Sequence, residues 1–245
     1  MLKENSISRQ PISRNTLKII ACIAMLCDHA GKSYIQGIYG RDSDIYFLLC
    51  DVIGRIAFPI FCALFIQGIM HTKNEMKHLI TLGVFAVISE PCFDLAIYHK
   101  WVYVRHQNVM LSWLLSCITI VLLKNLYAEY KTNKLDICAY VYIYLLIILL
   151  LSSLSFSLFI DYKMFIVPIT GIVFFVWKTF PNLQFWVIGA IIAIAEAAFY
   201  KTPGTLLAIP FMMLYDSTKI QKNNNVQRYS FYAFYPLHLL ILGFL

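Results

Sequence analysis

Ionisable side chains interrupt the longest apolar runs of this sequence. Among them are Asp28, His29, Lys32, Asp51, Arg55, Glu90, Asp94 and His238. If these runs cross a membrane, each charge costs at least about 2.5–3.5 kcal/mol to insert, so such residues are functional by default. A neutral imidazole is the usual base in acyl transfer, and a buried guanidinium can stabilise an oxyanion or hold a phosphate. His29 and Arg55 are therefore the first candidates for chemistry.

The spacing of residues around His29 predicts one stripe along a helix. Its members are separated by four, seven, four and three positions: Arg14, Lys18, Met25, His29 and Lys32. Lys18 then lies at one mouth of the stripe, with His29 deep inside. Asp28 points about 100° away from His29, which makes it a poor candidate to orient that ring. Instead, Asp28 is spaced to pair with Lys32, or it could reach Arg55 across helices.

The elements that carry these residues are those of a membrane protein. The chain has 245 residues, of which 60% are hydrophobic and 13% charged, and its mean hydropathy is +0.70. Soluble domains carry about 25% charged residues. The composition predicts an all-α, polytopic membrane helix bundle. We expect a polar, basic cytoplasmic segment at 1–16 and a single transmembrane domain at 17–245.

About nine segments are apolar enough to cross a bilayer, for which a helix needs about 20 residues. They are predicted at 17–35, 45–70, 77–98, 109–126, 137–154, 164–180, 183–199, 204–215 and 229–245. The eighth is short and has Pro203 and Pro210 beside or within it, so a re-entrant or broken helix is the alternative there.

The distribution of lysine and arginine predicts a cytoplasmic N-terminus. With that orientation the inner side carries thirteen of them: Lys3, Arg9, Arg14, Lys18, Lys73, Lys77, Lys124, Lys131, Lys134, Lys178, Lys219, Lys222 and Arg228. The outer side carries five: Arg41, Lys100, Arg105, Lys163 and Lys201. We therefore expect a multi-pass protein of the bacterial inner (cytoplasmic) membrane. The net charge of +7 mostly reflects this bias and requires no nucleic-acid partner.

Depth along the predicted helices brings four of the ionisable residues into one layer. Counting about 1.5 Å per residue, His29, Arg55, Glu90 and His238 lie roughly 14–20 Å from the first residues of their spans. This predicts a shared cavity. None of the seven cysteines forms a C-x-x-C pair, so we expect free thiols and no metal site.

Several long motifs, in order along the chain, resemble the TraX family. They are KIIACIAMLCDHAGK, GRIAFPIFCALFIQG followed by HTKN, ISEPCFDLA, an N-V-x-L at Asn108, an Asp161-Tyr162 pair and the closing FYAFYPLHLLIL. The resemblance implies acetylation of a pilin N-terminal amine, with acetyl-CoA as the donor. The chain is also distantly similar to the acyltransferase 3 group, in which a basic residue, ten further residues and a histidine open the first span. Lys18 and His29 match that spacing, with lysine in place of the usual arginine.

The chemistry of acetyl transfer would give each candidate residue a role. His29 would be the general base, Arg55 would stabilise the oxyanion, and Glu90 would hold an acceptor ammonium or set the protonation of His29. Arg14 and Lys18 would receive the CoA phosphates. The residues expected to contact the acceptor are Asp28, Asn108 and His238. The expected partners are membrane lipid and an acceptor peptide, small molecule or glycan, while the oligomeric state is left open.

Two other classes of function fit the same residues. A small proton-coupled transporter or channel would also use mid-membrane Asp, Glu, His and Arg, and it would have no reason to bind CoA. An assembly scaffold would use the charges only to pair helices, for example Asp51 with Arg55 and Asp28 with Lys32.

Overall fold

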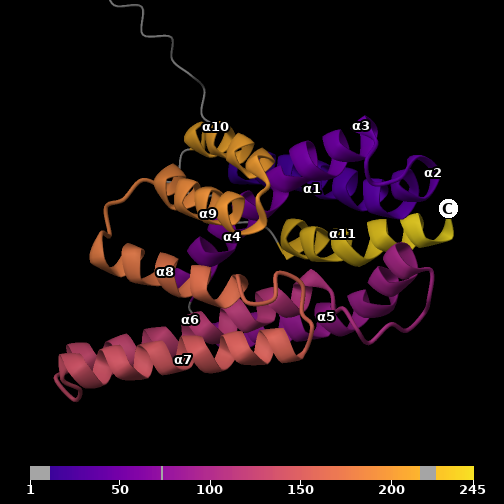
Figure 1. Cartoon of the computed structure of the whole chain (residues 1–245). Helices are drawn as coiled ribbons and strands as arrows, with labels where there is room; N and C mark the ends of the chain where they lie inside the picture. Colours follow the sequence, from indigo (N-terminus) through magenta and orange to yellow (C-terminus); the bar gives the residue numbers. More distant parts are fainter. Residues whose placement is uncertain (1–11, 73, 216–224) are drawn as a thin grey trace, which may run out of the picture.

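In the computed structural model, the described residues are 12–72, 74–215 and 225–245. Over this part of the chain the regular elements are helices, joined by two isolated β-bridges (Figure 1). Most of the predicted N-terminal segment 1–16, including Lys3 and Arg9, lies outside the described residues. So do Lys73, Lys219 and Lys222, which were counted on the predicted inner side.

The first two predicted spans are long helices with irregular turns in their middles. The first runs through α1 (Arg14–Ala30), a π-helical turn (Gly31–Ile35) and α2 (Gln36–Tyr39). The second runs through α3 (Asp44–Tyr46), a π-helical turn (Phe47–Ile53), a 3₁₀ turn (Gly54–Ile56) and α4 (Ala57–Met70). Such π-helical turns are frequent at functional sites.

Two glycines allow these irregular turns to approach closely. A Cβ atom on Gly54 would lie 2.7 Å from Cβ of Asp28, and one on Gly31 would overlap Sγ of Cys50. A larger residue at Gly54 would require a shift of the backbone, and one at Gly31 would require the Cys50 side chain to move. The close approach places the charges of both helices in one layer.

The remaining helices follow the predicted segments. They are α5 (Glu75–Tyr98), α6 (Val109–Lys131), α7 (Ile137–Ser157), α8 (Ile166–Thr179), α9 (Phe185–Tyr200), a 3₁₀ turn (Pro203–Leu207) leading into α10 (Ala208–Met213), and α11 (Asn225–Phe244). The side chains of Asn74, Asn108 and Asp136 cap α5, α6 and α7 by accepting a backbone N–H bond. The eighth predicted segment is short and irregular, in agreement with its prolines.

Four helices of the described residues are long and apolar enough to cross a membrane: 44–70, 75–98, 109–131 and 137–157. Shorter apolar helices lie at 166–179, 185–200, 203–213 and 229–244. The architecture is therefore that of a multi-pass membrane helix bundle. The total of nine spans and the cytoplasmic N-terminus stay predictions.

Contacts between loops sort the helix ends into two groups. At one end, Gln107 pairs with Ile160, and the Tyr162 and Tyr200 rings contact each other. At the other end, Ile12 pairs with Tyr215. This grouping agrees with helices that alternate in direction along the chain.

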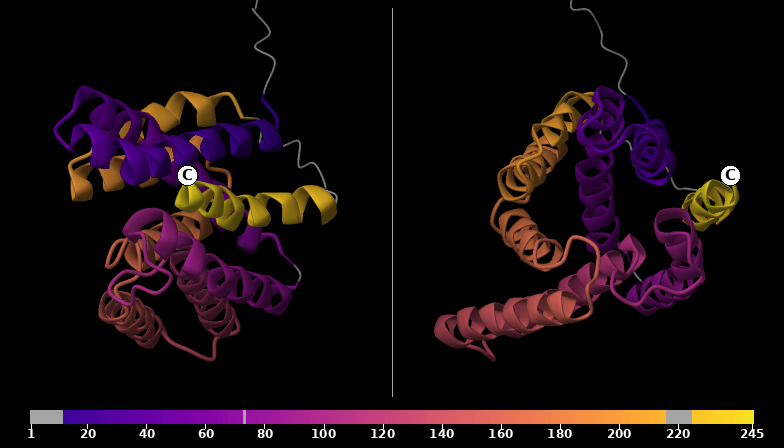
Figure 2. Two further views of the ribbon diagram at one scale, coloured as in Figure 1. Left: turned by 90° about the vertical axis from the view of Figure 1, so that its right-hand side faces the viewer. Right: turned by 45° about the vertical axis from the view of Figure 1, so that its right-hand side comes forward.

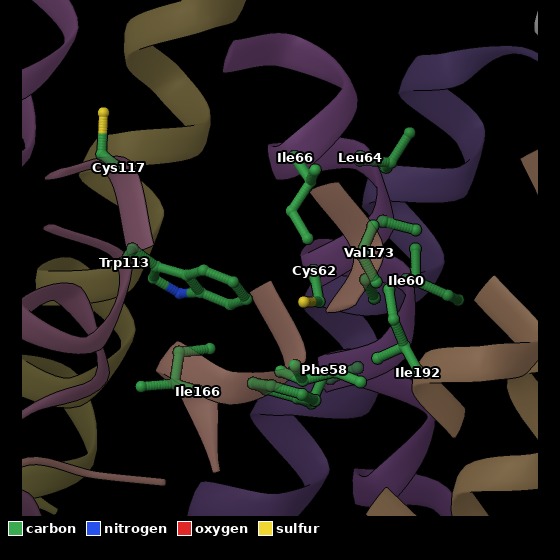
Figure 3. Close-up of a cluster of buried hydrophobic side chains, with 14 of the residues drawn as sticks. Phe58, Ile60, Cys62, Leu64, Ile66, Trp113, Cys117, Ile166, Val173 and Ile192 are labelled. Carbon is green, nitrogen blue, oxygen red and sulfur yellow. The ribbon is translucent and has the colours of Figure 1, made fainter. Parts of the chain in front are cut away.

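The core lies where α4, α6, α8 and α9 meet, and Figure 3 shows its side chains. The Trp113 indole points from α6 toward α4 and stacks on Phe58, with ring centroids 5.5 Å apart. Ile166 and Ile192 close the cluster from α8 and α9. By contrast, α7 projects from the bundle in the right-hand view of Figure 2, and its most apolar stretch is only 11% buried. Lipid is the natural cover for such a helix.

Candidate active site

A cavity of about 340 Å³ lies within the charged layer. Its helical wall carries Asp28, His29, Lys32 and Arg55. Its other wall comes from two loops, 99–108 and 158–165, and from the end of α9. That wall contributes His106, Asp161, Tyr162, Lys163 and Tyr200. We call this space the deep cavity.

A second cavity, of about 320 Å³, lies toward the N-terminal end of α1. We call it the basic cavity, because Arg14 and Lys18 are on its wall together with aromatic residues of α4 and α11. The two cavities share a wall of four residues: Met25, Phe61, Val109 and Trp113. All five members of the predicted stripe on the first helix therefore line one cavity or the other.

His29 and His238 form a hydrogen-bonded pair between α1 and α11. Nδ1 of His29 lies 2.7 Å from Nε2 of His238, and Nδ1 of His238 lies 2.7 Å from the carbonyl oxygen of Phe234. Because a carbonyl can only accept, Nδ1 of His238 carries a hydrogen, and Nε2 of the neutral ring is then an acceptor. His29 must donate from Nδ1. The Nε2 atom of neutral His29 is left with its lone pair available.

Most of the charges near His29 are arranged in pairs. Nζ of Lys32 lies 2.6 Å from the Asp28 carboxylate, and the Arg55 guanidinium lies 3.5 Å from that of Asp51. Both are the i,i+4 pairs that the sequence spacing predicts. Nε2 of His29 is 4.0 Å from the Asp28 carboxylate, too far for a hydrogen bond but close enough to favour an imidazolium. Asp28 is thus nearer the reactive face of His29 than its helical phase predicts.

This arrangement can do acid–base chemistry. His29 lines the deep cavity and has a lone pair available on Nε2, and Asp28, 4.0 Å from that atom, can stabilise the charge that appears when it takes a proton. Arg55 lines the same cavity, and its Nε–H is buried with no hydrogen-bond partner among the described residues. It is therefore a donor that an oxyanion or phosphate could use.

Glu90 and Asn108 lie elsewhere. Asn108 is fully buried and caps α6: Oδ1 accepts from the Met110 N–H at 2.8 Å, and Nδ2 donates to the Ala86 carbonyl and to Glu90. Glu90 also accepts from the Asn108 backbone N–H at 3.1 Å. Neither residue lines the two cavities. The structure does not bring either of them to His29, and their contacts join α5 to α6.

The proposed cofactor-binding residues stand at the opposite end of α1 from His29. The Arg14 guanidinium donates to the Leu64 carbonyl at 3.0 Å, and Nζ of Lys18 lies 4.6 Å from the centre of the Phe231 ring. Lys18 is eleven residues from His29, roughly 16 Å along a helix. In the part of the chain that the structure describes, no group of three or more His, Cys, Asp or Glu is arranged to hold a metal ion.

Two features of the structure were not assigned a role from the sequence. Asp161 and Tyr162 form one of the sequence motifs noted above, but only the fold shows that they line the same cavity as His29. Glu196 of α9 is completely buried, and neither carboxylate oxygen has a hydrogen-bond partner within the described ranges. A single acidic residue in the apolar run 185–200 was the signal that could have found it.

The fold and the site define a polytopic helical membrane protein with a charged cavity lined by His29, which His238 contacts from outside the cavity wall. The chain matches the family described as "TraX protein" over residues 13–245, and it belongs to that family. It is 24% identical over 247 residues to a protein of Dichelobacter nodosus described as "Probable fimbrial assembly protein FimC, serogroup H1", and 92% of each chain is covered. No solved structure matches.

Proposed function

We propose that this TraX-family protein is a membrane acetyltransferase that moves an acetyl group from acetyl-CoA to an acceptor amine or hydroxyl. The observation that carries the proposal is the pair of adjoining cavities, one with cations at its wall and one lined by His29, whose Nδ1 is hydrogen-bonded to His238. The description of the Dichelobacter nodosus relative supports a pilin, or another membrane-associated peptide, as the acceptor.

The basic cavity suits the donor. Lys18 offers a charge for the CoA phosphates, and the buried Nε–H of Arg14 has no hydrogen-bond partner in the described part of the chain. The neighbouring wall is aromatic, with Phe61, Phe65 and Trp113, and it suits the thin, weakly polar pantetheine arm. A thioester that passes the shared wall would reach the deep cavity.

The deep cavity suits the transfer step. The acceptor nitrogen or oxygen attacks the thioester carbonyl carbon, a new C–N or C–O bond forms, and the C–S bond breaks. Nε2 of His29 takes the proton that the acceptor loses and returns it to the departing CoA sulfur, so that the products are the acetylated acceptor and CoA. Arg55 donates to the carbonyl oxygen as negative charge develops on it. Asp28 stabilises the transient imidazolium.

Binding of acetyl-CoA to the purified protein, measured by calorimetry, tests the donor half of this proposal. We expect saturable binding that survives in His29→Ala and weakens about tenfold in Lys18→Ala, because a charge-assisted hydrogen bond is worth about 1.5–3 kcal/mol. Lys134→Ala is the matched control, since Lys134 is exposed in the loop between α6 and α7. If the wild type does not bind acetyl-CoA at millimolar concentration, the transporter hypothesis is favoured instead.

The donor is cytoplasmic only if the N-terminus is inside, and thiol labelling tests this orientation. In a cysteine-free background, a membrane-impermeant reagent should label a cysteine at Asp42 in intact cells. It should label a cysteine at Asn133 only after the membrane is opened. The reverse pattern would place the basic cavity on the outer face and exclude cytoplasmic acetyl-CoA.

A further inference from the structure

The loop wall of the deep cavity is held more firmly than an ordinary connection. The N–H of Gln107 donates to the Phe159 carbonyl at 3.0 Å, and the N–H of Asp161 donates back to the Gln107 carbonyl at 3.2 Å. The side chains of Ser112 and Ser155 donate to the carbonyls of Asp161 and Lys163. These bonds join loops 99–108 and 158–165 into one rigid wall.

Three residues of this wall have positive φ angles, which residues other than glycine rarely adopt. Phe159, Tyr162 and Lys163 have φ angles of 52°, 58° and 29°. Non-glycine residues with positive φ persist where the surroundings over-determine them, and such strain clusters at functional sites. Here the conformation keeps Asp161 and Tyr162 on the cavity wall.

The charge pairing in the deep cavity distinguishes Asp161 from Asp28. The Asp28 carboxylate is neutralised by Lys32 at 2.6 Å. Among the described residues, the Asp161 carboxylate accepts only from the Tyr162 backbone N–H, at 3.0 Å, and the basic group paired with it there is Nε2 of His106 at 4.0 Å. Its side chain keeps 35% of its surface exposed. A carboxylate has about four lone-pair sites, so Asp161 retains capacity for a cationic donor.

We propose that Asp161, with His106 beside it, binds the ammonium group of an acceptor that enters the deep cavity from the side of loops 99–108 and 158–165. The inference rests on the proposed acetyltransferase function. The acceptor then approaches His29 from the end opposite Arg14 and Lys18, and donor and acceptor meet across the membrane. Before attack the ammonium releases one proton to the solvent, which leaves an amine with the lone pair that forms the C–N bond. The second proton leaves as that bond forms, and it passes through Nε2 of His29 to the departing CoA sulfur.

Acceptor kinetics test the role of Asp161. Purified protein is supplied with radiolabelled acetyl-CoA and a short apolar peptide with a free N-terminal amine, or its analogue with a hydroxyl in place of that amine. Asp161→Asn should raise KM for the amine peptide about 10- to 100-fold and leave KM for acetyl-CoA unchanged, because one charge-assisted contact is lost. Asp42→Asn is the control, as Asp42 is an exposed acid of the loop 40–43.

The outcomes test the ammonium site at Asp161 separately from the acetyltransferase function. An unchanged KM for the amine in Asp161→Asn, or equal use of the hydroxyl analogue by the wild type, overturns the ammonium site. Asp161→Glu, which keeps the charge, should retain the preference for the amine if Asp161→Asn fails to fold. Absence of both transfer and acetyl-CoA binding in the wild type rejects the acetyltransferase itself, which is a distinct result.

The route of the acceptor is tested with wild-type protein alone, in sealed vesicles that keep the orientation of the cell membrane. Transfer is expected when the peptide is outside and acetyl-CoA is inside. Transfer that requires both on the same side would overturn entry from the side of the loops.

Discussion

Replacement of His238 by leucine should slow the reaction without removing the base. His238→Leu takes away the acceptor 2.7 Å from Nδ1 of His29, so the proton of neutral His29 is no longer held on Nδ1. The tautomer with the proton on Nε2 cannot accept from a substrate. Partners that fix the orientation and tautomer of a functional histidine are worth about 10- to 100-fold, or ~1.4–2.7 kcal/mol.

The assay is the initial rate of acetyl transfer at saturating acetyl-CoA. We expect kcat to fall by that factor in His238→Leu and by about 100- to 10,000-fold in His29→Ala, which loses the base itself. The double variant should be no slower than His29→Ala, because the two rings act as one unit. His238→Gln should recover part of the loss, since an amide oxygen can accept from Nδ1.

His71→Leu is the matched control. The Nδ1 atom of His71 also meets a carbonyl four residues earlier, that of Gln67 at 2.8 Å, but the ring lines neither cavity. Its kcat should stay within about twofold of the wild type. A His238→Leu protein that is folded and has wild-type kcat would refute the tautomer argument.

Three further substitutions separate chemistry from architecture. Arg55→Lys should lower kcat about 100-fold with little change in unfolding temperature, because an ammonium cannot reproduce the planar fork; full activity would make Arg55 a structural partner of Asp51. Asn108→Ala should lower the free energy of unfolding by about 1–3 kcal/mol, because it removes a helix cap and its bond to Glu90, and kcat of the folded enzyme should be unchanged. A selective loss of kcat would restore a role for Asn108 in acceptor binding. Gly54→Ala should destabilise the protein by about 1–3 kcal/mol in a thermal melt, because the added Cβ would meet Asp28. Gly83→Ala is the control and should not destabilise it, since a Cβ at Gly83 has no neighbouring atom within 4 Å. Equal effects of the two substitutions would contradict the close approach at Gly54.

The sequence predicts the helices and the stripe on the first helix well, because both depend on local periodicity. Lys18 and His29 share a face by helix geometry alone, whatever surrounds them. The i,i+4 pairs of Asp28 with Lys32 and Asp51 with Arg55 are predictable for the same reason.

Contacts between distant helices were not predictable in that way. Depth along the span places Glu90 in the layer of His29, but depth does not fix which way a residue faces around its helix. In the structure Glu90 faces Asn108 at the start of α6. The His29–His238 bond joins residues 209 positions apart, and it depends on how α11 packs between α1 and α5. Asp161 reaches the deep cavity through a loop conformation that no periodic pattern encodes.

The wall shared by the two cavities bears on whether the protein leaks protons across the membrane. A charged passage that joined both faces of the bilayer would conduct protons and dissipate the membrane potential. Met25, Phe61, Val109 and Trp113, which line both cavities, carry no charge, whereas Lys18 lines one cavity and His29 the other. Hydrophobic constrictions of this kind block ions by excluding water. With the acceptor entering from one face and acetyl-CoA from the other, as proposed above, this uncharged wall would keep ions from following them while no substrate is bound.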